Sequence, residues 1–531
     1  MNESKLPRAK NLNLLFAEVK NDDRLFCVSY SGSRVQEQIT YKTYVDQLKK
    51  LAALLYEEYH IRPGDRVMVV PFNDHFTLIV YGALIHLSAV IVPVNPEEND
   101  EFADFVRNDA GCRLCISVAK ALQAWQGAVD IKFVEMQSLV RQAMTSICQL
   151  PDIDRDNELA LLIYTSGTTG RSKGVMLTQK NILANASAVS ALHEMNKDTV
   201  QLCVLPLFHV NAFNLSFVAS LYSGSTLILS KRFYLPSFWQ IIAAEKVMFV
   251  PVAPLIVQQL VDDPREVTGL PIPKTLRYLI SAAAPLSNKL LNAFLTKFPN
   301  IRLLQGYGLS ESVNFSLTVP PSLDSETYKK VMLDEDRPSA GIPLPGCEIE
   351  AMDSNGHVLA EKQTGELVIR SDSNMLGYLN GAEINSEVYK WGWLHTGDLC
   401  WWQIIDDQRF FYLCGRLKET VKRKGETVSL LEIDESLSHY SDQYGQMIAV
   451  GFENDYAGEE IGLYVIPEAE SSLADVDYLE LCQKLFPRYR MPRAIVFGEH
   501  IPRTATGKIQ RNKLAYNFES FKVVNLENKK N

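Results

Sequence analysis

A run of glycine, serine and threonine residues directly follows a short apolar segment at residues 161–163. Residues 164–174 read Tyr-Thr-Ser-Gly-Thr-Thr-Gly-Arg-Ser-Lys-Gly. Glycine permits positive φ, so successive backbone N–H groups can converge on an oxyanion. The hydroxyl groups and Lys173 add donors and a positive charge. This loop is therefore expected to bind phosphate, although its spacing is not that of a Walker A loop, and a flexible surface linker has a similar composition.

Short motifs of small, aromatic and charged residues continue along the chain. Taken singly each is weak, because Tyr307 alone would be a core residue, Asp398 a turn residue and Lys508 a solvated charge. The motifs are Leu205-Pro-Leu-Phe-His209, Ser281-Ala-Ala-Ala-Pro-Leu286, Gln305-Gly-Tyr-Gly-Leu-Ser-Glu311, Gly341-Ile-Pro-Leu-Pro-Gly346, Trp393-Leu-His-Thr-Gly-Asp398, Gly415-Arg-Leu-Lys-Glu419 and Pro502-Arg-Thr-Ala-Thr-Gly-Lys508.

In this order, from Thr40 to Arg511, the motifs resemble those of the adenylate-forming superfamily. That superfamily includes acyl-CoA synthetases, luciferases and the adenylation domains of peptide synthetases. The resemblance implies an ATP- and Mg²⁺-dependent acid–thiol ligase that first forms acyl-AMP and then an acyl thioester. Two anions must meet in the first step, so catalysis has to rest on positioning and charge neutralisation.

The resemblance also implies a nucleotide site. Asp398 and Arg416 would bind the ribose, Tyr307 would offer its ring face to adenine, and Glu311 with Thr165 would ligate Mg²⁺. The full set of nucleotide-binding residues implied is Thr165, Ser166, Gly167, Thr168, Thr169, Gly170, Lys173, Ala283, Ala284, Gln305, Gly306, Tyr307, Gly308, Ser310, Asp398, Arg416 and Lys508.

Three catalytic residues follow from the same resemblance. Lys508 would approach the carboxylate and the α-phosphate during adenylation. His209 would line the acyl pocket, with a satisfied buried histidine as the alternative. Lys422, together with Thr427, would belong to the face used for thiol transfer, with a solvated lysine as the alternative. The C-terminal domain would rotate between the two half-reactions about a hinge at Lys418.

The sequence leaves the acid and the thiol open. The acid pocket is expected near residues 209–213, 281–283 and 312–314, whose small and neutral side chains are compatible with a fatty or aryl acid. Coenzyme A is the expected acceptor, and an acyl carrier protein remains an alternative.

Other classes of enzyme fit less well. An amino-acid adenylation enzyme is disfavoured because residues 210–214 contain no carboxylate to meet an ammonium group. A serine hydrolase is disfavoured because the segment around Ser310 lacks the last glycine of G-x-S-x-G. A non-catalytic binding protein is disfavoured while Lys508, Glu311 and Asp398 are all present.

Alternating strands and helices must position these loops. Buried strands are predicted at residues 67–70, 160–164, 200–205, 226–229, 247–250 and 278–280, with helices after Thr40 and at 238–245 and 289–297. This rhythm indicates an α/β fold with ligand loops at strand ends.

The predicted domains are a large N-terminal domain at residues 1–415 and a small, mobile α+β domain at 416–518. The large domain comprises layered α/β subdomains and a β-rich subdomain that begins near Gly341. A frayed tail at residues 519–531 is expected because it is polar and lysine-rich.

Composition supports an ordinary globular enzyme. The chain has 531 residues, 47% of them hydrophobic and 22% charged, and a net charge of −10. So acidic a chain is not expected to bind nucleic acid. The nine scattered cysteines and the absence of an apolar N-terminal segment predict a reduced, cytoplasmic protein. The apolar run at 76–94 is expected to be a buried helix and strand and not a membrane segment.

Overall fold

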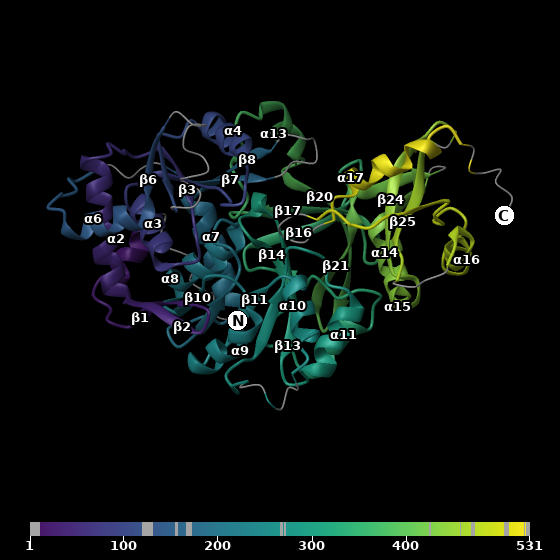
Figure 1. Cartoon of the computed structure of the whole chain (residues 1–531), viewed down its shortest axis with the longest axis horizontal. Coiled ribbons are helices and arrows are strands. Elements are labelled where there is room, and N and C mark those ends of the chain that lie inside the picture. Colours follow the sequence, from purple (N-terminus) through teal and green to yellow (C-terminus); the bar gives the residue numbers. More distant parts are fainter. Residues whose placement is uncertain are drawn as a thin grey trace.

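The computed structural model describes residues 11–118, 131–153, 158–165, 172–265, 269, 272–423, 426–456, 458–468, 473–503, 509–524 and 526. A broad N-terminal body, coloured purple to green, carries a smaller yellow-green body at one end (Figure 1). This arrangement is the predicted α/β architecture, with α+β structure at the C-terminus.

The first large sheet is seven-stranded in the described residues, in the order β18-β8-β7-β4-β3-β5-β6. Its central strands are parallel, and β7 pairs with β8 in antiparallel fashion across the predicted phosphate loop. The strands are β3 (Arg66–Val70), β4 (Val90–Pro93), β5 (Leu114–Ser117), β6 (Lys132–Glu135), β7 (Leu159–Thr165), β8 (Lys173–Thr178) and β18 (Gly377–Tyr378).

The second large sheet is nine-stranded in the described residues, in the order β15-β14-β13-β12-β11-β9-β10-β1-β2. Parallel pairing from β13 to β1 brings the carboxyl ends of these strands to one edge. The strands are β1 (Leu25–Ser31), β2 (Arg34–Thr40), β9 (Val200–Cys203), β10 (Thr226–Ser230), β11 (Phe249–Val252), β12 (Tyr278–Ser281), β13 (Arg302–Gly308), β14 (Phe315–Thr318) and β15 (Ile342–Pro343).

Helices pack against these two sheets. The helix predicted after Thr40 is α2, and its first turn is capped by the Thr40 hydroxyl, which accepts from the Thr43 N–H at 3.1 Å. The helices are α1 (Asn13–Val19), α2 (Tyr41–Glu57), α3 (His75–His86), α4 (Asp100–Ala110), α6 (Met136–Thr145), α7 (Gln179–Leu192), the π-helix η1 (Ala212–Val218), α8 (Ala219–Ser223), α9 (Leu235–Ala244), α10 (Pro254–Val261), α11 (Asn288–Lys297), the 3₁₀-helix η3 (Ser310–Ser312), α12 (Ser325–Leu333) and α13 (Ala382–Val388).

The predicted β-rich subdomain is an antiparallel sheet. A long hairpin dominates it and turns at Asp406 and Asp407, both at positive φ. Its strands are β16 (Cys347–Met352), β17 (Gly365–Ser371), β19 (Tyr389–Lys390), β20 (Trp393–Ile405) and β21 (Gln408–Arg416).

The C-terminal body follows a short 3₁₀ segment and has hydrophobic cores of its own, separate from the main core. Beyond Phe518, the side chains of Phe521 and Leu526 join one of these cores. The elements are η4 (Leu417–Glu419), β22 (Thr420–Arg423), β23 (Glu426–Ser429), α14 (Leu430–Ser438), α15 (Ser441–Tyr444), β24 (Gln446–Asn454), β25 (Gly458–Ile466), α16 (Asp475–Leu485), β26 (Ala494–Phe497), α17 (Arg511–Ala515) and η5 (Tyr516–Phe521).

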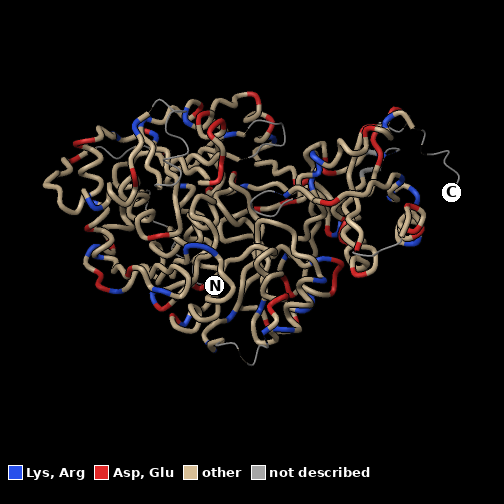
Figure 2. The backbone as a smooth tube through the Cα atoms, viewed as in Figure 1, with Lys and Arg blue, Asp and Glu red and all other residues tan. Residues whose placement is uncertain are grey.

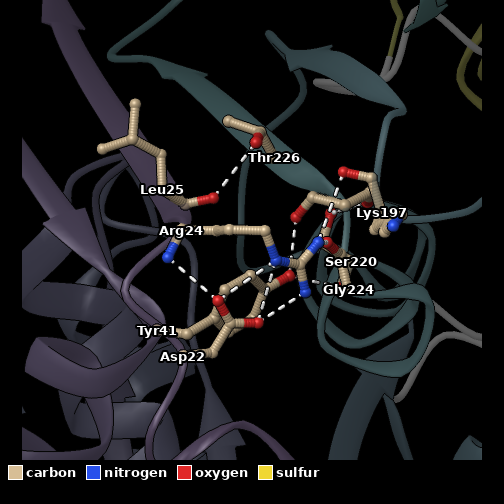
Figure 3. Close-up of polar contacts among 9 residues, drawn as sticks. Asp22, Arg24, Leu25, Tyr41, Lys197, Ser220, Gly224 and Thr226 are labelled. Carbon is tan, nitrogen blue, oxygen red and sulfur yellow. Dashed lines mark hydrogen bonds and ion pairs between the residues drawn. The ribbon is translucent and has the colours of Figure 1, made fainter.

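Polar contacts connect the segment before β1 and the start of α2 to the connection between α8 and β10 (Figure 3). Arg24 pairs with Asp22 and donates to the Gly224 carbonyl at 3.0 Å. The buried Tyr41 hydroxyl donates to the carbonyls of Ser220 and Ser225. These bonds satisfy carbonyls at the end of α8 and in the turn that leads to β10.

Charges of both signs are interspersed over the backbone (Figure 2). In the part of the chain that the structure describes, no helix is long and apolar enough to span a membrane. The apolar run at 76–94 forms most of α3 together with β4. All nine cysteines carry free thiols, and Cys112 and Cys115 are buried.

Candidate active site

A cleft of about 3500 Å³ lies where the strand ends, the β-rich subdomain and the C-terminal body meet. It gathers every predicted site residue whose side chain the structure describes. Those residues are Thr165, Lys173, His209, Ala283, Ala284, Gln305, Gly306, Tyr307, Gly308, Ser310, Glu311, Asp398 and Arg416.

Other predicted residues fall outside this description. Ser166, Gly167, Thr168, Thr169, Gly170 and Lys508 lie outside the described residues. For Lys422 and Thr427 the structure describes only the backbone, where the two residues face each other across β22 and β23.

The two ends of the predicted phosphate loop face each other. Thr165 and Lys173 are cross-strand partners in the β7–β8 pair, so the loop between them leaves and re-enters the sheet at one point. Lys173 Nζ lies 5.3 Å from the centroid of the Tyr378 ring, a cation–π contact. Tyr378 is held there because β18 pairs with β8.

Tyr378 also contacts the predicted metal ligand. Its hydroxyl donates to Glu311 Oε1 at 2.7 Å, and the Glu311 carbonyl accepts from the Met375 N–H. Burial, followed by the charge of Glu311, raises the pKa of Tyr378, which therefore remains a hydrogen-bond donor. The Tyr378 side chain thus contacts both Lys173 of the predicted phosphate loop and the carboxylate of Glu311.

The residues present fit a Mg²⁺ ion that arrives with a nucleotide. Among the described residues there is no group of three histidine, cysteine or acidic side chains that could hold a metal alone. Mg²⁺ in nucleotide sites is commonly bound by one or two carboxylates together with phosphate oxygens and water. Glu311, half-buried in the cleft wall, would supply that single carboxylate, and Thr165 would supply a hydroxyl.

Asp398 lies between Tyr307 and Arg416. Its Oδ2 accepts from the Tyr307 hydroxyl at 2.7 Å, and its Oδ1 pairs with Arg416 Nε at 2.9 Å. Strand pairing produces this contact, since Asp398 and Arg416 face each other in the β20–β21 pair. The Asp398 charge raises the pKa of Arg416, and burial, followed by that charge, raises the pKa of Tyr307. The carboxylate is thereby oriented at the cleft wall.

Glu366 holds the turn that presents Asp398. Its two carboxylate oxygens contact His395 Nδ1 at 2.7 Å and the Gly397 N–H at 2.9 Å. Gly397 has φ of +72°, a conformation that favours glycine. The Thr396 hydroxyl accepts from the Asp398 N–H and donates to the Leu367 carbonyl. This network fixes the conformation of the turn that leads to Asp398.

The predicted adenine loop follows β12 and adjoins β13. Ala283 has φ of +72°, a strained conformation for a residue with a side chain. On β13, a Cβ on Gly308 would lie 1.6 Å from the Asn314 carbonyl, and one on Gly306 would lie 2.8 Å from the Phe315 ring. Glycine is therefore required at both positions for β13 to approach β14.

His209 follows β9 in a turn closed by its N–H to the Pro206 carbonyl. Its half-buried ring lies 4.4 Å from the Phe208 ring between centroids, and the residue lines the cleft. This placement agrees with a pocket-lining residue.

The C-terminal body contributes an acidic and basic cluster near the hinge. Arg511 pairs with Asp434, and its Nη1 lies 3.8 Å from Glu419 Oε2. Arg337 of the N-terminal body pairs with Glu435 at 2.8 Å. Burial raises the pKa of Asp434 to about 6 and of Glu435 to about 7, against the lowering effect of each arginine. The Arg337–Glu435 pair connects the two bodies in the observed orientation, and the Arg511 contacts lie within the C-terminal body.

Sequence reasoning missed Tyr378 and Glu366. Both had a weak signal, since Tyr378 follows a glycine and Glu366 is a charged residue beside an apolar run. Neither signal pointed to a ligand, because each side chain acts by holding another residue.

The fold and the cleft define an AMP-binding enzyme. The family model described as AMP-binding enzyme matches residues 16–379, and the chain belongs to that family.

Two relatives and one solved structure are similar over much of their length. The oxalate–CoA ligase of Arabidopsis thaliana is 28% identical over 90% of this chain and 93% of its own. The sulfoacetate–CoA ligase of Cupriavidus necator is 32% identical over 67% of this chain and 66% of its own. The structure of o-succinylbenzoate CoA synthetase from Bacillus subtilis, bound to ATP and magnesium ion, superposes with a TM-score of 0.80 at 22% identity, covering 95% of this chain and 99% of that one. The shared fold agrees with the predicted architecture.

Proposed function

We propose that this enzyme is an AMP-forming acid–CoA ligase that works through an acyl-adenylate. The observation that carries the proposal is that one cleft holds both the Tyr307–Asp398–Arg416 cluster and the Lys173–Tyr378–Glu311 cluster. The first suits a nucleoside and the second suits a phosphate chain. The names of the relatives, which are CoA ligases, support this assignment.

In the first half-reaction a carboxylate oxygen of the acid attacks the α-phosphorus of ATP. A new P–O bond forms, the bond to the β-phosphate breaks, and pyrophosphate leaves. Asp398 accepts hydrogen bonds from the ribose, while Lys173 and the loop residues Ser166 and Thr168 hold the departing phosphates. Lys508 neutralises the carboxylate and the α-phosphate. This arrangement reduces the repulsion between two anions.

Mg²⁺ bound with ATP would add charge neutralisation at the phosphates. Glu311 and Thr165 are the residues that would hold it. Tyr378 orients the Glu311 carboxylate toward the cleft.

In the second half-reaction the thiol of coenzyme A loses its proton to water, and its sulfur attacks the acyl carbonyl carbon. The C–O bond to AMP breaks and AMP leaves. We assign Lys422 and Thr427 to the face used in this step, and His209 to the wall of the acyl pocket.

The two half-reactions require different faces of a mobile C-terminal domain. We place the division at residues 1–415 and 416–518, with the tail at 519–531. The separate hydrophobic cores and the short connection at η4 support a rigid body that turns about Lys418.

A carrier protein as acceptor and an amino acid as substrate remain the second candidates. The relatives are named for different acids, so their names do not choose one for this chain. A fatty or aryl acid stays the starting proposal. The free thiols and the described helices are compatible with a cytoplasmic enzyme.

The test is a pyrophosphate-release screen across carboxylic acids, with and without coenzyme A. Acid-dependent release of pyrophosphate and formation of an acyl-CoA are expected. ATP binding without release under any acid would favour a non-catalytic protein. Release without acyl-CoA would favour a carrier protein as acceptor.

A further inference from the structure

The acid pocket contains hydrogen-bonding side-chain atoms that lack partners. Asn211 Oδ1, Gln305 Oε1 and Asn314 Nδ2 are buried, and none has a hydrogen-bond partner among the described residues. All three residues line the cleft. Asn314 is only 3% exposed and Gln305 only 7%, so solvent does not readily replace a partner. Buried polar groups in folded proteins are almost always paired, and an unpaired one costs free energy.

Contacts of neighbouring residues relate these amides to one another. Gln305 faces Ser281 across β12 and β13, and the Ser281 hydroxyl also lacks a partner. Asn314 is next to Phe315, whose carbonyl accepts from Asn185 Nδ2 at 2.9 Å. Asn185 in turn accepts from Asn214 of η1, three residues after Asn211. Asn211 and Asn314 thus belong to two of the segments predicted to form the acid pocket, and Gln305 lies beside Ser281 of the third.

The interior behind the pocket is filled by aromatic rings. Phe213 lies 5.3 Å from the Tyr81 ring and 5.7 Å from the Phe217 ring between centroids. All three side chains are almost fully buried. A long alkyl chain that followed η1 inward would have to displace them, at the cost of well-packed core.

The unpaired side chains are amides, which carry no charge. Asn211, Gln305 and Asn314 all line the cleft, where His209 adds an imidazole. A hydroxyl both donates and accepts, so it can pair with an amide whichever way the amide is turned. A second carboxylate can only accept hydrogen bonds and would leave a buried amide oxygen unpaired.

We propose that the acid of this ligase is short and carries a neutral hydroxyl or amide group at the end away from its reacting carboxylate. Asn211 and Asn314 bind that group. The inference rests on the proposed function and narrows its acid from the fatty or aryl class.

The test measures acid-dependent pyrophosphate release with matched acids that differ by one group. The pairs are butanoate with 4-hydroxybutanoate and benzoate with 4-hydroxybenzoate, and octanoate and succinate are added as chain-length and charge controls. We expect kcat/KM for the hydroxy acid to exceed that of its partner by about 10-fold or more, because sites with buried polar groups reject analogues that cannot pair with them.

Two variants test the residues. Asn314→Leu and, because the buried position could affect folding, the half-buried Asn211→Leu should each reduce the preference for the hydroxy acid by about 10-fold. Circular dichroism and ATP binding check that each variant is folded.

The outcomes separate the inference from the function beneath it. A wild-type preference for octanoate, for succinate or for the unsubstituted partners would overturn the inference and leave the ligase function standing. An unchanged preference in both folded variants would also overturn the assignment of these amides. No pyrophosphate release with any acid would instead contradict the proposed function.

Discussion

The hydroxyl of Tyr378 donates to Glu311 Oε1 at 2.7 Å while its ring faces Lys173 Nζ at 5.3 Å. The residue comes from β18, far along the chain from both partners, and reaches them because β18 pairs with β8. A side chain that orients a metal-binding carboxylate affects metal affinity without touching the metal.

Tyr378→Phe should therefore raise the Mg²⁺ concentration needed for half-maximal pyrophosphate release by about 10-fold or more. The change removes the bond to Glu311 and keeps the ring beneath Lys173. A Mg²⁺ titration at saturating ATP measures it. Tyr389→Phe is the matched control, because its hydroxyl donates to the Met375 carbonyl and not to the carboxylate. Equal Mg²⁺ requirements in both variants would remove Tyr378 from this role.

Asp398→Asn should lower kcat/KM for ATP by about 10- to 100-fold. The change removes the charge that pairs with Arg416 and weakens the charge-assisted bonds expected with the ribose. Calorimetric titration with ATP and steady-state kinetics measure it. The control is Asp372→Asn, an exposed carboxylate paired with Lys180 outside the cleft. If ATP affinity stays at the wild-type value, Asp398 does not bind the nucleotide.

Lys508→Ala should abolish adenylation and spare thiol transfer from chemically supplied acyl-AMP. Lys418→Pro fixes φ at the hinge, so it should leave adenylation largely intact and slow transfer. Both half-reactions are measured separately, and Lys513→Ala on α17 serves as the surface control. Domain alternation is the wrong mechanism if Lys508→Ala slows both steps equally and Lys418→Pro slows neither.

The interface between the two bodies predicts a pH dependence of stability. Glu435, with a pKa raised to about 7, faces Arg337 and Asp336 and shares α14 with Glu432 and Asp434. A native-state pKa above the unfolded value means that stability is fullest below about pH 4.5 and is lost as pH rises to about 7.

We expect the free energy of unfolding to fall over this range by up to about 1.4 kcal/mol per pH unit for this group. Glu435→Gln removes the titrating group and should make the fall shallower, which denaturant titrations at several pH values measure. Glu326→Gln, an exposed helix position, is the control. If the free energy of unfolding of the wild-type protein rises with pH over this range, Glu435 ionises in the folded protein at little cost in free energy.

A buried ion pair should control the stability of the C-terminal domain. Arg423 and Glu460 are each about 1% exposed, with Arg423 Nε 3.0 Å from Glu460 Oε1, and Arg423 also donates to the Tyr489 and Met491 carbonyls. Glu460→Gln should cost about 3–5 kcal/mol because it leaves a buried charge without its counterion.

Differential scanning calorimetry measures this change, and the Arg423→Met/Glu460→Met double variant should recover part of the loss. The exposed pair Lys522–Glu453 offers the control, and Lys522→Met should leave the transition unchanged. If the Glu460→Gln variant unfolds at the wild-type transition temperature, the Arg423–Glu460 pair does not stabilise the C-terminal domain.

Much of the fold was predictable because buried parallel strands are continuous apolar runs. Residues 160–164 and 278–280 lie in β7 and β12 as expected. The strand predicted at 247–250 instead occupies Phe249–Val252, because Lys246 adopts positive φ and the Val247 N–H closes the end of α9 onto the Ile242 carbonyl. Apolar composition alone does not separate a helix end from a strand start.

The site residues that could be predicted are those that belong to a motif, and the described ones line the cleft. Arg423 belongs to a strongly charged segment, yet it is fully buried, because the side chains of β22 alternate between two faces and Arg423 pairs with Glu460 of β25. Such long-range partners, like Tyr378 for Glu311, depend on tertiary pairing and leave little trace in local sequence.

Asp398 and Arg416 form the last cross-strand residue pair of β20 and β21 before the chain enters η4. The rotation proposed about that segment displaces each atom in proportion to its distance from the axis. Arg416, which is close to the axis, would therefore move very little. The contact with the ribose would then be kept during the rotation. The adenylate would stay bound while the loop that carries Lys508 moves away from it. The intermediate would not have to be released and rebound between the two half-reactions, which limits its loss to hydrolysis.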